Sequence, residues 1–585
     1  MRAIHNAADV NYRSPLGAVP AGTLVRLAAD ADEKPALRLW IDGKELILSP
    51  KAVLAGEEGL SRYEFYFTPD SPGIIWYRFL FDGASLVPGS DPLLGELSVR
   101  DAYESFQLTV YSPDFSVPQW TVGRVMYQIF PDRFARAPSV PKIPGRVYHT
   151  HWDDPITIDP LPGKDEYTAY DFYGGNFRGI ESRLDYLSLL GVTALYINPV
   201  YRAVSNHRYD VGDYTMPDPL LGTPEDYESL CAQALRRDIR VLADGVFSHT
   251  GDESIYFDRS GNEAVPGAYR DKCSPYFGWY RFRSWPDDYD CWWGVKSLPE
   301  VDEENPSFSE FINGENGVAR LWLRRGASGW RLDVADELPD SFLEAFRRAA
   351  KSEKDAFIVG EVWEDATNKV SYGKLRRYLL GAQLDSVMNY PFRRWIIDLL
   401  TGKLGAAGFA ANLRALLSNY PPPCINSLMN FLSTHDTPRI TSILGGMPED
   451  IDRARAQGFA LSPQARELAL RRHALAAALL FTLPGIPCIY YGDELGLEGG
   501  PDPLNRHTFP AEGFGSAQPL HRLYSELAAM RKNPALARGE TKVSSCGSTL
   551  CLERTFGSEK AELTLDPQTL ETELVCGEKK LLFRR

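Results

Sequence analysis

Three carboxylates follow short apolar runs that have the composition of β-strands. Asp333 and Glu361 end the runs 329–333 and 357–361, and Asp436 comes soon after a third such run. Because neighbouring parallel strands end at the same edge of a sheet, we expect the three side chains to meet there. Converging carboxylates favour either divalent-metal binding or acid–base chemistry on a neutral substrate.

Neighbouring residues give two of these carboxylates different settings. Side chains two apart on a strand point the same way, so Arg331 is expected to lie beside Asp333 and keep it ionised. Trp363 follows Glu361 by two residues and offers a drier, aromatic setting that favours the protonated carboxyl. A charged and a protonated carboxyl form the pair that glycoside hydrolysis requires. We therefore predict Asp333 as the nucleophile and Glu361 as the general acid and then base.

The elements that would position these groups alternate between strand-like and helix-like runs beyond about residue 123. This alternation predicts parallel strands joined by crossover helices. The eight predicted strands are 125–129, 194–197, 241–244, 329–333, 357–361, 386–389, 428–432 and 488–491, and the clearest helices are 179–190, 224–237 and 465–481. The predicted fold is therefore α/β, a (β/α)8 TIM barrel with its chemistry at the carboxyl ends of the strands.

Three further segments accompany the barrel, which we place at residues 123–514. Residues 1–118 hold short alternating strands with Asp-Gly and Pro-Gly turns, which predict an N-terminal β-sandwich. Residues 250–300, rich in aromatic, Gly and Pro residues, predict a small inserted domain after the third strand. Residues 515–585 predict a small C-terminal all-β domain. Strands are predicted at 23–28, 36–41, 63–67, 74–81 and 106–111 in the first segment, and at 550–554, 562–565 and 573–576 in the last.

The composition is that of a large globular protein with an acidic surface. The 585 residues carry 63 Lys and Arg against 78 Asp and Glu, a formal net charge of −15. This balance argues against a nucleic-acid or anionic-membrane partner. The first residues lack the apolar stretch of a signal peptide and no run is long enough to span a bilayer, so we expect a cytoplasmic location. The eight cysteines lack metal-type spacing, and only Cys546 and Cys551 lie close enough in sequence for a local disulfide.

Four segments in a fixed order carry a family resemblance. They are Asp-Gly-Val-Phe-Ser-His at 244–249, Gly-Trp-Arg-Leu-Asp at 329–333, Val-Gly-Glu-Val-Trp at 359–363 and Phe-Leu-Ser-Thr-His-Asp at 431–436. In this order and at these strand positions they resemble the four conserved regions of the α-amylase family of retaining glycoside hydrolases. The segments 125–134 and 172–180, together with the β-sandwich before the barrel, are similar to the neopullulanase, cyclomaltodextrinase and maltogenic amylase group.

The resemblance implies roles for individual residues. It implies Asp333 as nucleophile, Glu361 as acid and base, and Asp436 as a third carboxylate that grips sugar hydroxyls. Tyr209 matches an aromatic platform under the cleaved sugar, which suits a sugar because a flat ring removes its apolar face from water. The other substrate-binding residues that the resemblance implies are His207, Asp210, Asp244, His249, Arg331, Trp363, His435, Asp502 and Arg506.

The chain departs from the family pattern at several positions. Ser248 stands where the family usually has Asn, and Glu364 stands where the closest group often has His. Residues 135–150 lack the Asn- and Asp-rich loop that binds calcium in many relatives, so structural calcium is not expected there and no cofactor is predicted. The N-terminal domain is carbohydrate-binding-like in that group, and the resemblance implies a homodimer formed through it.

The leading hypothesis is a retaining α-glycosidase that acts through a covalent glycosyl intermediate on Asp333. Its expected targets are α-1,4 bonds, with α-1,6 bonds as a further class, in maltooligosaccharides, cyclodextrins or pullulan. A transglycosylase or isomerase on the same site is one alternative, and a non-catalytic barrel that binds sugars or serves as an interaction subunit is another. Metal-dependent hydrolysis is a third, although no His-x-Glu or paired-His zinc motif appears.

Overall fold

Eight parallel strands form the central sheet of the computed structural model, which describes residues 1–99, 104–137, 142–158, 169–512, 515 and 517–583. They are β13 (Met126–Ile129), β16 (Ala194–Ile197), β19 (Arg240–Gly245), β22 (Gly329–Leu332), β23 (Phe357–Gly360), β26 (Ser386–Val387), β27 (Met429–Phe431) and β28 (Ile486–Tyr490). The sheet order is β26-β23-β22-β19-β16-β13-β28-β27, and a parallel bridge between Met388 and Met429 joins its two edges. The sheet is a closed barrel, and all eight predicted strands are confirmed.

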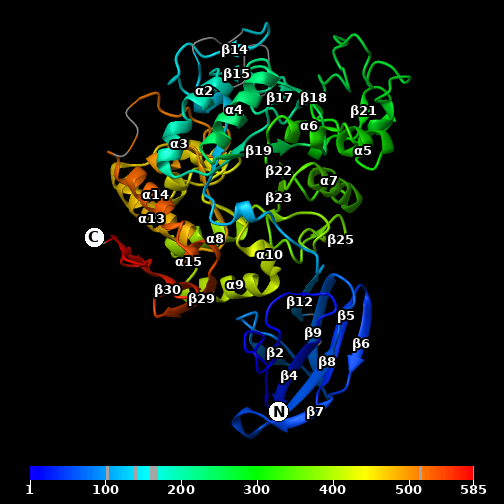
Figure 1. The fold of residues 1–585 in the computed structure, drawn as a ribbon, viewed down its shortest axis with the longest axis vertical. Coiled ribbons are helices and arrows are strands. Elements are labelled where there is room, and N and C mark those ends of the chain that lie inside the picture. The colour runs from blue at the N-terminus through cyan, green and yellow to red at the C-terminus, as the bar shows by residue number, and fades with distance from the viewer. Residues whose placement is uncertain (100–103, 138–141, 159–168, 513–514, 516, 584–585) are drawn as a thin grey trace.

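Helices surround the barrel (Figure 1). They are α1 (Pro131–Phe134), α2 (Phe177–Ser182), α3 (Leu184–Leu190), α4 (Pro224–Arg236), α5 (Pro306–Asn313), α6 (Val318–Arg324), α7 (Asp340–Glu353), α8 (Tyr390–Leu400), α9 (Ala406–Asn419), α10 (Pro422–Ile425), α11 (Ile440–Leu444), α12 (Ile451–Gln457), α13 (Pro463–Thr482), α14 (Pro519–Met530) and α15 (Pro534–Arg538). The helix α4 begins at Pro224, as the sequence predicts. Thr223 just before it forms a reciprocal capping box with Asp226 in the first turn. The predicted helix 179–190 is instead two helices, since the chain bends at Arg183 between α2 and α3.

The barrel strands are buried almost throughout, and only Arg240 at the start of β19 is partly exposed. Every residue of β16, β22 and β23 is buried, as expected for parallel strands covered by helices. Arg331 differs from the apolar residues beside it on β22, because it is a cation with no exposed surface. A buried charge must be paired, so this residue marks the place where the apolar barrel becomes a polar site.

The N-terminal domain is a sandwich of two sheets, as the sequence predicts. Its strands are β1 (Ala3–Ile4), β2 (Arg13–Ser14), β3 (Val19–Pro20), β4 (Val25–Ala31), β5 (Ala36–Ile41), β6 (Lys44–Leu48), β7 (Ala52–Ala55), β8 (Ser61–Phe67), β9 (Gly73–Phe81), β10 (Ala84–Pro88), β11 (Gly95–Ser98) and β12 (Phe106–Tyr111). One sheet is built on β1-β4-β8-β7 and the other on β11-β10-β9-β12, with β5 beside β9 and β6 beside β5. Alternating residues such as Leu37, Leu39, Ile75 and Tyr77 form the core between the sheets.

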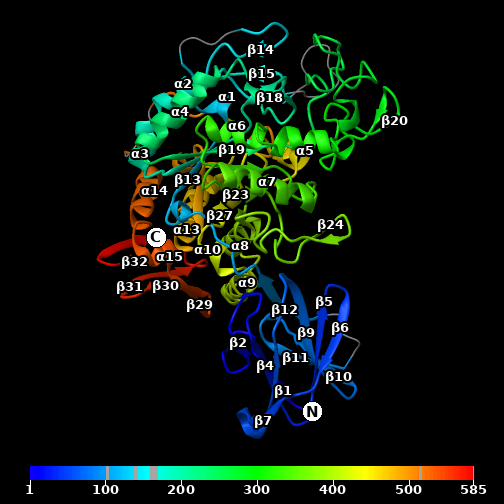
Figure 2. The ribbon, with the colours of Figure 1, turned by 45° about the vertical axis from the view of Figure 1, so that its right-hand side comes forward.

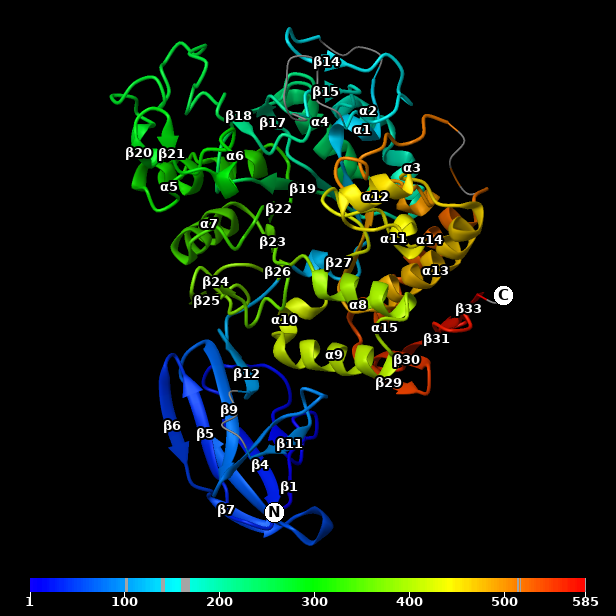
Figure 3. The same cartoon turned by 180° about the vertical axis from the view of Figure 1, so that it is seen from behind.

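Two smaller parts complete the chain. The insertion after β19 carries the short strands β20 (Phe282–Ser284) and β21 (Asp288–Tyr289), and it projects to one side of the barrel (Figure 2). The C-terminal sheet is the meander β29 (Glu540–Cys546), β30 (Thr549–Phe556), β31 (Glu559–Asp566), β32 (Glu571–Cys576) and β33 (Lys579–Phe583). Helix α9 lies between β12 of the sandwich and β29 of this meander and contacts both (Figure 3).

The domain boundaries stay predictions from the sequence. The boundary at 514/515 falls beside residues 513–514 and 516, which lie outside the described part of the chain. All eight cysteines are free, so Cys546 and Cys551 form no disulfide. They lie on paired strands but face Thr549 and Ser544 rather than each other. Among the described residues, no helix combines the length and the apolar character needed to cross a bilayer.

Candidate active site

Arg331 holds three carboxylates together at the carboxyl end of the barrel. Its Nη1 lies 2.9 Å from Asp244 Oδ1 and 2.5 Å from Asp333 Oδ1, and its Nη2 lies 2.7 Å from Glu361 Oε2. The four residues come from β19, β22 and β23 or directly follow them, and these strands are neighbours in the sheet. The structure thus brings the two predicted reacting carboxylates, Asp333 and Glu361, onto the two ends of one guanidinium.

Each oxygen of Glu361 has a separate set of donors. Oε2 accepts from Arg331 and from the Val334 backbone N–H at 2.9 Å. Oε1 accepts from the Trp363 indole N–H at 3.0 Å and from the Tyr390 hydroxyl at 3.4 Å. The Trp363 ring stacks on Tyr390 with centroids 4.0 Å apart. Trp363 therefore contacts Glu361 through a polar N–H, and not through the apolar face that the sequence led us to expect.

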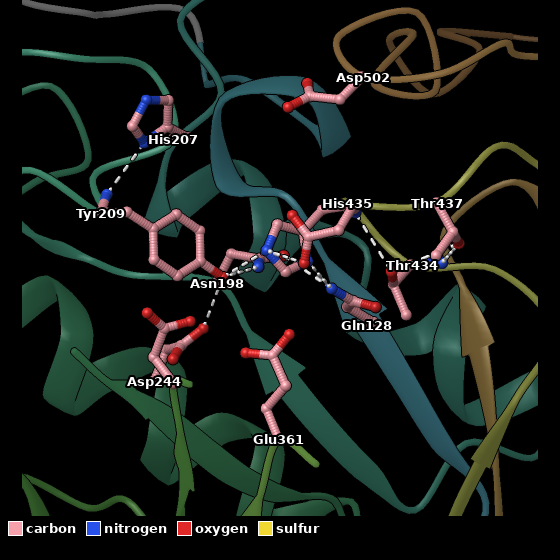
Figure 4. A network of polar contacts seen from close by, with 12 residues as sticks. Gln128, Asn198, His207, Tyr209, Asp244, Glu361, Thr434, His435, Thr437 and Asp502 are labelled. Atoms are coloured by element: carbon pink, nitrogen blue, oxygen red, sulfur yellow. Dashed lines mark hydrogen bonds and ion pairs between the residues drawn. The ribbon is translucent and has the colours of Figure 1, made fainter. Parts of the chain in front are cut away.

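A network of neutral polar groups links Asp436 to Tyr209, the predicted aromatic platform (Figure 4). The Gln128 amide nitrogen lies 2.9 Å from His435 Nδ1; because an amide nitrogen only donates, Nδ1 accepts and the ring proton lies on Nε2. His435 Nε2 lies 3.1 Å from Asp436 Oδ2 and 2.5 Å from the Tyr209 hydroxyl. Tyr209 in turn donates to Asp244 Oδ2 at 3.0 Å, so its ring is fixed above the carboxylates.

Sequence reasoning missed several members of this network. Gln128 bonds both His435 and Asn198, Asn198 donates to the Tyr209 hydroxyl at 2.9 Å, and Tyr196 donates to Asp244 Oδ2 at 2.6 Å. A signal was present, because Gln128 is a polar residue inside an otherwise apolar predicted strand and Asn198 directly follows another. Polar residues at strand ends of a barrel point to its site.

Burial dominates the electrostatics of the carboxylates. Burial raises the pKa of Asp333 well above its ordinary value, and the charges of Glu361 and Asp244 add to this increase while Arg331 opposes it. Burial also raises the pKa of Asp244, again against Arg331. The expectation that Arg331 alone keeps Asp333 ionised is therefore wrong in its net direction, since one guanidinium is shared among three carboxylates.

Burial shifts Asp436 and His435 toward their neutral forms, with opposite changes in pKa. Burial, reinforced by the charge of Glu361, raises the pKa of Asp436 to about 7, although Arg506 and Arg331 lower it. Burial and the cations Arg506 and Arg331 lower the pKa of His435 well below its usual range, which keeps that ring neutral. The neutral ring agrees with the single proton that the hydrogen bonds place on Nε2.

Three predicted residues lie around this centre and mainly support it. His207 Nδ1 accepts from the Tyr209 backbone N–H at 3.1 Å (Figure 4). Asp210 accepts from the Ser205 and Val204 backbone N–H groups and from the Ser205 hydroxyl, so its carboxylate anchors the loop that carries Tyr209. His249 Nδ1 lies 3.0 Å from the hydroxyl of Ser248, the residue that departs from the family pattern.

Asp502 and Arg506 form a pair on the loop after β28. Arg506 Nη2 lies 2.9 Å from Asp502 and 3.7 Å from Asp436 Oδ1, and its Nε donates to the His435 carbonyl at 3.0 Å. Asp502 keeps about half of its side chain exposed. The pair thus borders the site next to Asp436, with Asp502 as its outward group.

No metal ligand set is apparent in this region. Among the described residues, no three or more His, Cys, Asp or Glu side chains are arranged to hold a metal ion. The segment 135–150 contains no Asp or Asn, and its residues 138–141 lie outside the described part. Calcium prefers several carboxylate or carbonyl oxygens, so the side chains of this segment do not fit it, and the absence of calcium stays a prediction.

Comparison with known proteins gives one family and several relatives that match most of this chain. The family model described as alpha amylase, catalytic domain, matches residues 128–518. The chain is 32% identical over 563 residues to neopullulanase 2 of Thermoactinomyces vulgaris, covering 93% of this chain and 86% of that protein. It is 37% identical over 566 residues to the amylopullulanase of Thermoanaerobacter thermohydrosulfuricus, covering 86% of this chain.

The chain spans only 37% of the length of that amylopullulanase. Among solved structures, the cyclic alpha-maltosyl-(1→6)-maltose hydrolase from Arthrobacter globiformis matches with a TM-score of 0.65 and 30% sequence identity. That match covers 80% of this chain and 99% of the other.

Proposed function

Because this chain belongs to the alpha-amylase family, we propose that it is a retaining α-glycosidase acting on α-glucans. The observation that carries the proposal is the position of Asp333 and Glu361 on one guanidinium, at the ends of adjacent strands. Retaining glycosidases need their two carboxyl groups close together, whereas inverting ones need space for a water between them. Two carboxylates on the two terminal nitrogens of Arg331 favour the close arrangement.

The hydrogen bonds of Glu361 support different roles for the two carboxyl groups. Glu361 Oε2 is occupied by Arg331 and the Val334 N–H, so a transferable proton belongs on Oε1, on the side of Trp363. Glu361 would donate this proton to the departing glycosidic oxygen while Asp333 attacks the anomeric carbon. Water activated by Glu361 would then hydrolyse the glycosyl ester, which restores both groups.

With all of its carboxyl groups ionised, the site would hold more negative than positive charge. Asp244, Asp333 and Glu361 together would carry three negative charges against the one positive charge of Arg331. Retaining a proton in this cluster reduces the imbalance, in line with the raised pKa of Asp333. The proposed reaction requires Asp333 charged and Glu361 protonated, so the proton of this cluster has to lie on Glu361 in the reacting complex.

The remaining residues would grip one sugar ring. The Tyr209 ring is fixed by three polar partners and offers a flat apolar surface, while Asp436, His435 and His249 offer hydrogen-bonding groups around it. This combination of one flat face and a polar periphery suits a glucose ring. The relatives named amylopullulanase, neopullulanase and cyclic maltosyl-maltose hydrolase support α-1,4 and α-1,6 glucosidic bonds as the targets.

A product profile tests the proposal. Purified protein is incubated with maltotriose, panose, pullulan and β-cyclodextrin, and we expect glucose or maltose to appear with retained α-configuration by NMR. Asp333→Asn should lower turnover by about 10⁴-fold or more with an unchanged circular dichroism spectrum. Asp114→Asn, at an exposed position in the segment between sandwich and barrel, is the matched control and should behave as the parent. No turnover by the parent on any of the four glucans would refute the proposal.

Transfer to a sugar is the second candidate activity. Trp363 stacks on Tyr390 on the side of Glu361 Oε1 and remains 49% exposed, so it offers an acceptor sugar a flat surface there. Beside it Glu364, which stands where the group often has His, pairs with Lys369. Product analysis at high maltotriose concentration separates the two activities, because transfer gives products longer than the substrate.

We also propose the cytoplasm as the compartment and a homodimer through the N-terminal domain. Eight free cysteines, including the exposed Cys273 and Cys546, support a reducing compartment. Sedimentation equilibrium tests the dimer, and a monomer at micromolar concentration would contradict it.

A further inference from the structure

The residue that follows the predicted nucleophile has a backbone conformation that L-amino acids rarely adopt. Val334 has a φ of +34°, in the left-handed region that favours glycine. In the described part of the chain, the other non-glycine residues with positive φ all have an unbranched Cβ. A side chain branched at Cβ makes this conformation especially unfavourable. Backbone strain of this kind gathers at functional sites, and Val334 lies directly beside Asp333.

The strained backbone directs two successive N–H groups to Glu361. The Val334 N–H donates to Glu361 Oε2 at 2.9 Å, and the Ala335 N–H donates to the Glu361 carbonyl at 3.2 Å. In a regular strand, successive N–H groups point to opposite sides. The backbone of Val334 lies between these two groups, and a left-handed residue at such a place makes successive N–H groups converge. The strain therefore gives the acid/base residue a double attachment.

These contacts hold Glu361 from both sides of the nucleophile. The Glu361 N–H donates to the Leu332 carbonyl at 3.0 Å, just before Asp333, whereas the Val334 and Ala335 N–H groups come just after it. The first of these bonds belongs to the ladder between β22 and β23, and the other two continue the attachment where that ladder ends. The backbone therefore sets the place of Asp333 relative to Glu361, in addition to the guanidinium that contacts both carboxylates.

The turn after the strained residue is fixed by a neighbouring hairpin. This hairpin consists of β24 (Val370–Ser371) and β25 (Lys374–Leu375). The Ser371 hydroxyl donates to the Asp336 carbonyl at 3.0 Å, and Arg376, directly after β25, donates to the same carbonyl at 3.1 Å. A strained conformation persists only where the surrounding structure opposes its relaxation. The hairpin supplies such opposition, because it holds the chain two residues beyond the strained position.

We propose that Val334 is a positioning residue whose left-handed backbone sets the spacing of Asp333 and Glu361, which deepens the proposed function and rests on it. Retaining hydrolysis depends on a short, fixed separation of the two carboxyl groups. Glycine would adopt the same turn without strain, but it would also leave the turn easily. A branched side chain allows the backbone fewer conformations than glycine does, so within the surrounding contacts it keeps both N–H groups aimed at Glu361.

Val334→Gly tests the inference, because stability and turnover should change in opposite directions. Glycine relieves the strain, so the midpoint of thermal unfolding should rise by about 1–2 °C. The kcat on maltotriose should fall by about tenfold, since a looser N–H weakens one hydrogen bond to the acid/base carboxylate. The KM should change by less than about twofold, because that N–H acts on Glu361 and not on the bound sugar. Val334→Ala keeps a Cβ and should stay within about threefold of the parental kcat.

Glu58→Gly is the matched control, because Glu58 is an exposed residue of the sandwich with a φ of +52°. It releases similar strain away from the carboxylates and should leave kcat at the parental value.

Amide exchange followed by mass spectrometry separates this inference from the proposed function, since it needs no turnover. The peptide that contains residues 334–335 should exchange about fivefold faster in Val334→Gly than in the parent. Unchanged exchange, a parental kcat in Val334→Gly, or a loss of kcat together with a lower unfolding midpoint would each overturn the positioning role. A parent without turnover on any glucan would refute the proposed function instead, and the exchange rates would then decide whether the strain fixes the turn.

Discussion

Two buried carboxylates in this molecule, Asp30 in the sandwich and Asp333 in the barrel, have opposite electrostatics. Asp30 accepts two hydrogen bonds from Arg62, at 2.7 and 2.8 Å, while Glu57 lies farther from that guanidinium at 3.7 Å; Asp30 also accepts from the Tyr12 hydroxyl and the Glu57 N–H. Burial raises its pKa, but these donors outweigh burial and lower the pKa overall. Asp333 shares Arg331 with two other carboxylates, and its pKa is raised.

The difference teaches that the number of donors for each carboxylate separates a structural ion pair from a reactive one. Both sites use Asp and Arg at short distance, so the pair itself does not distinguish them. Asp30 accepts from three different residues and is held charged, whereas Asp333 accepts from a guanidinium that two other carboxylates share, which favours its protonated form. Strongly shifted groups of the second kind are typical of functional sites.

The same substitution at the two arginines gives the largest contrast. Arg331→Lys should lower turnover on maltotriose by about 10³-fold, because a compact ammonium does not reach three carboxylates in the fixed geometry of a guanidinium. Arg62→Lys should leave turnover at the parental value. Steady-state rates of both purified variants give the answer, and an Arg331→Lys enzyme with more than a tenth of the parental rate would contradict the shared-cation account.

Removing the cation from the structural pair should affect stability instead. Arg62→Met should lower the free energy of unfolding of the sandwich by about 2–3 kcal/mol near pH 7, since Asp30 is left buried with an incomplete set of partners. The folded pKa of Asp30 lies below its unfolded value, so this stabilisation is present above about pH 4 and is lost as the pH falls further. Urea unfolding at pH 7 and pH 3 measures the gap, and an equal gap at both would rule out Asp30 as its source.

Asp436 should show the reverse pH dependence. Its folded pKa of about 7 exceeds the unfolded value, so the folded state binds the proton more tightly and the parent loses stability as the pH rises from about 4 through 7. Asp436→Asn lacks this titration. At pH 8 its free energy of unfolding should therefore exceed that of the parent by about 1 kcal/mol, a small difference because a third of the Asp436 side chain is exposed. Near pH 4 the two should coincide, and a less stable variant at pH 8 would show that burial does not raise the pKa of Asp436.

The smallest effect is expected from one donor to the acid/base group. Trp363→Phe removes the N–H that reaches Glu361 Oε1 but keeps a ring on Tyr390, so kcat on maltotriose should fall by only about fivefold. Trp120→Phe is the matched control, since it removes an indole N–H bound to the Asp355 carbonyl far from the carboxylates. Equal rates for both variants would mean that this hydrogen bond has no part in catalysis.

The barrel and the meeting of Asp333 with Glu361 could be predicted from the sequence, whereas the competition for Arg331 could not. Each barrel strand is a buried apolar run, and Asp333 and Glu361 stand where such runs end. The edge strands β6 and β7 were missed because most of their residues are exposed, so burial imposes no pattern on them. That Arg331 also contacts Asp244 depends on β19 lying beside β22, a neighbour relation that spans almost ninety residues and leaves no trace in local spacing.

The barrel has one weak seam, and the seam separates the parts of the site. Between β26 and β27 the sheet is joined by the single Met388–Met429 bridge and the Asn389 N–H bond to the Met429 carbonyl, while other neighbours share ladders. Asp333 and Glu361 lie on one side of it, and Asp436 follows β27 on the other. Local opening at this seam costs the fewest backbone bonds of any place in the barrel. An opening at this seam would move Asp436 relative to Asp333 and Glu361, which stay together because β22 and β23 share an intact ladder.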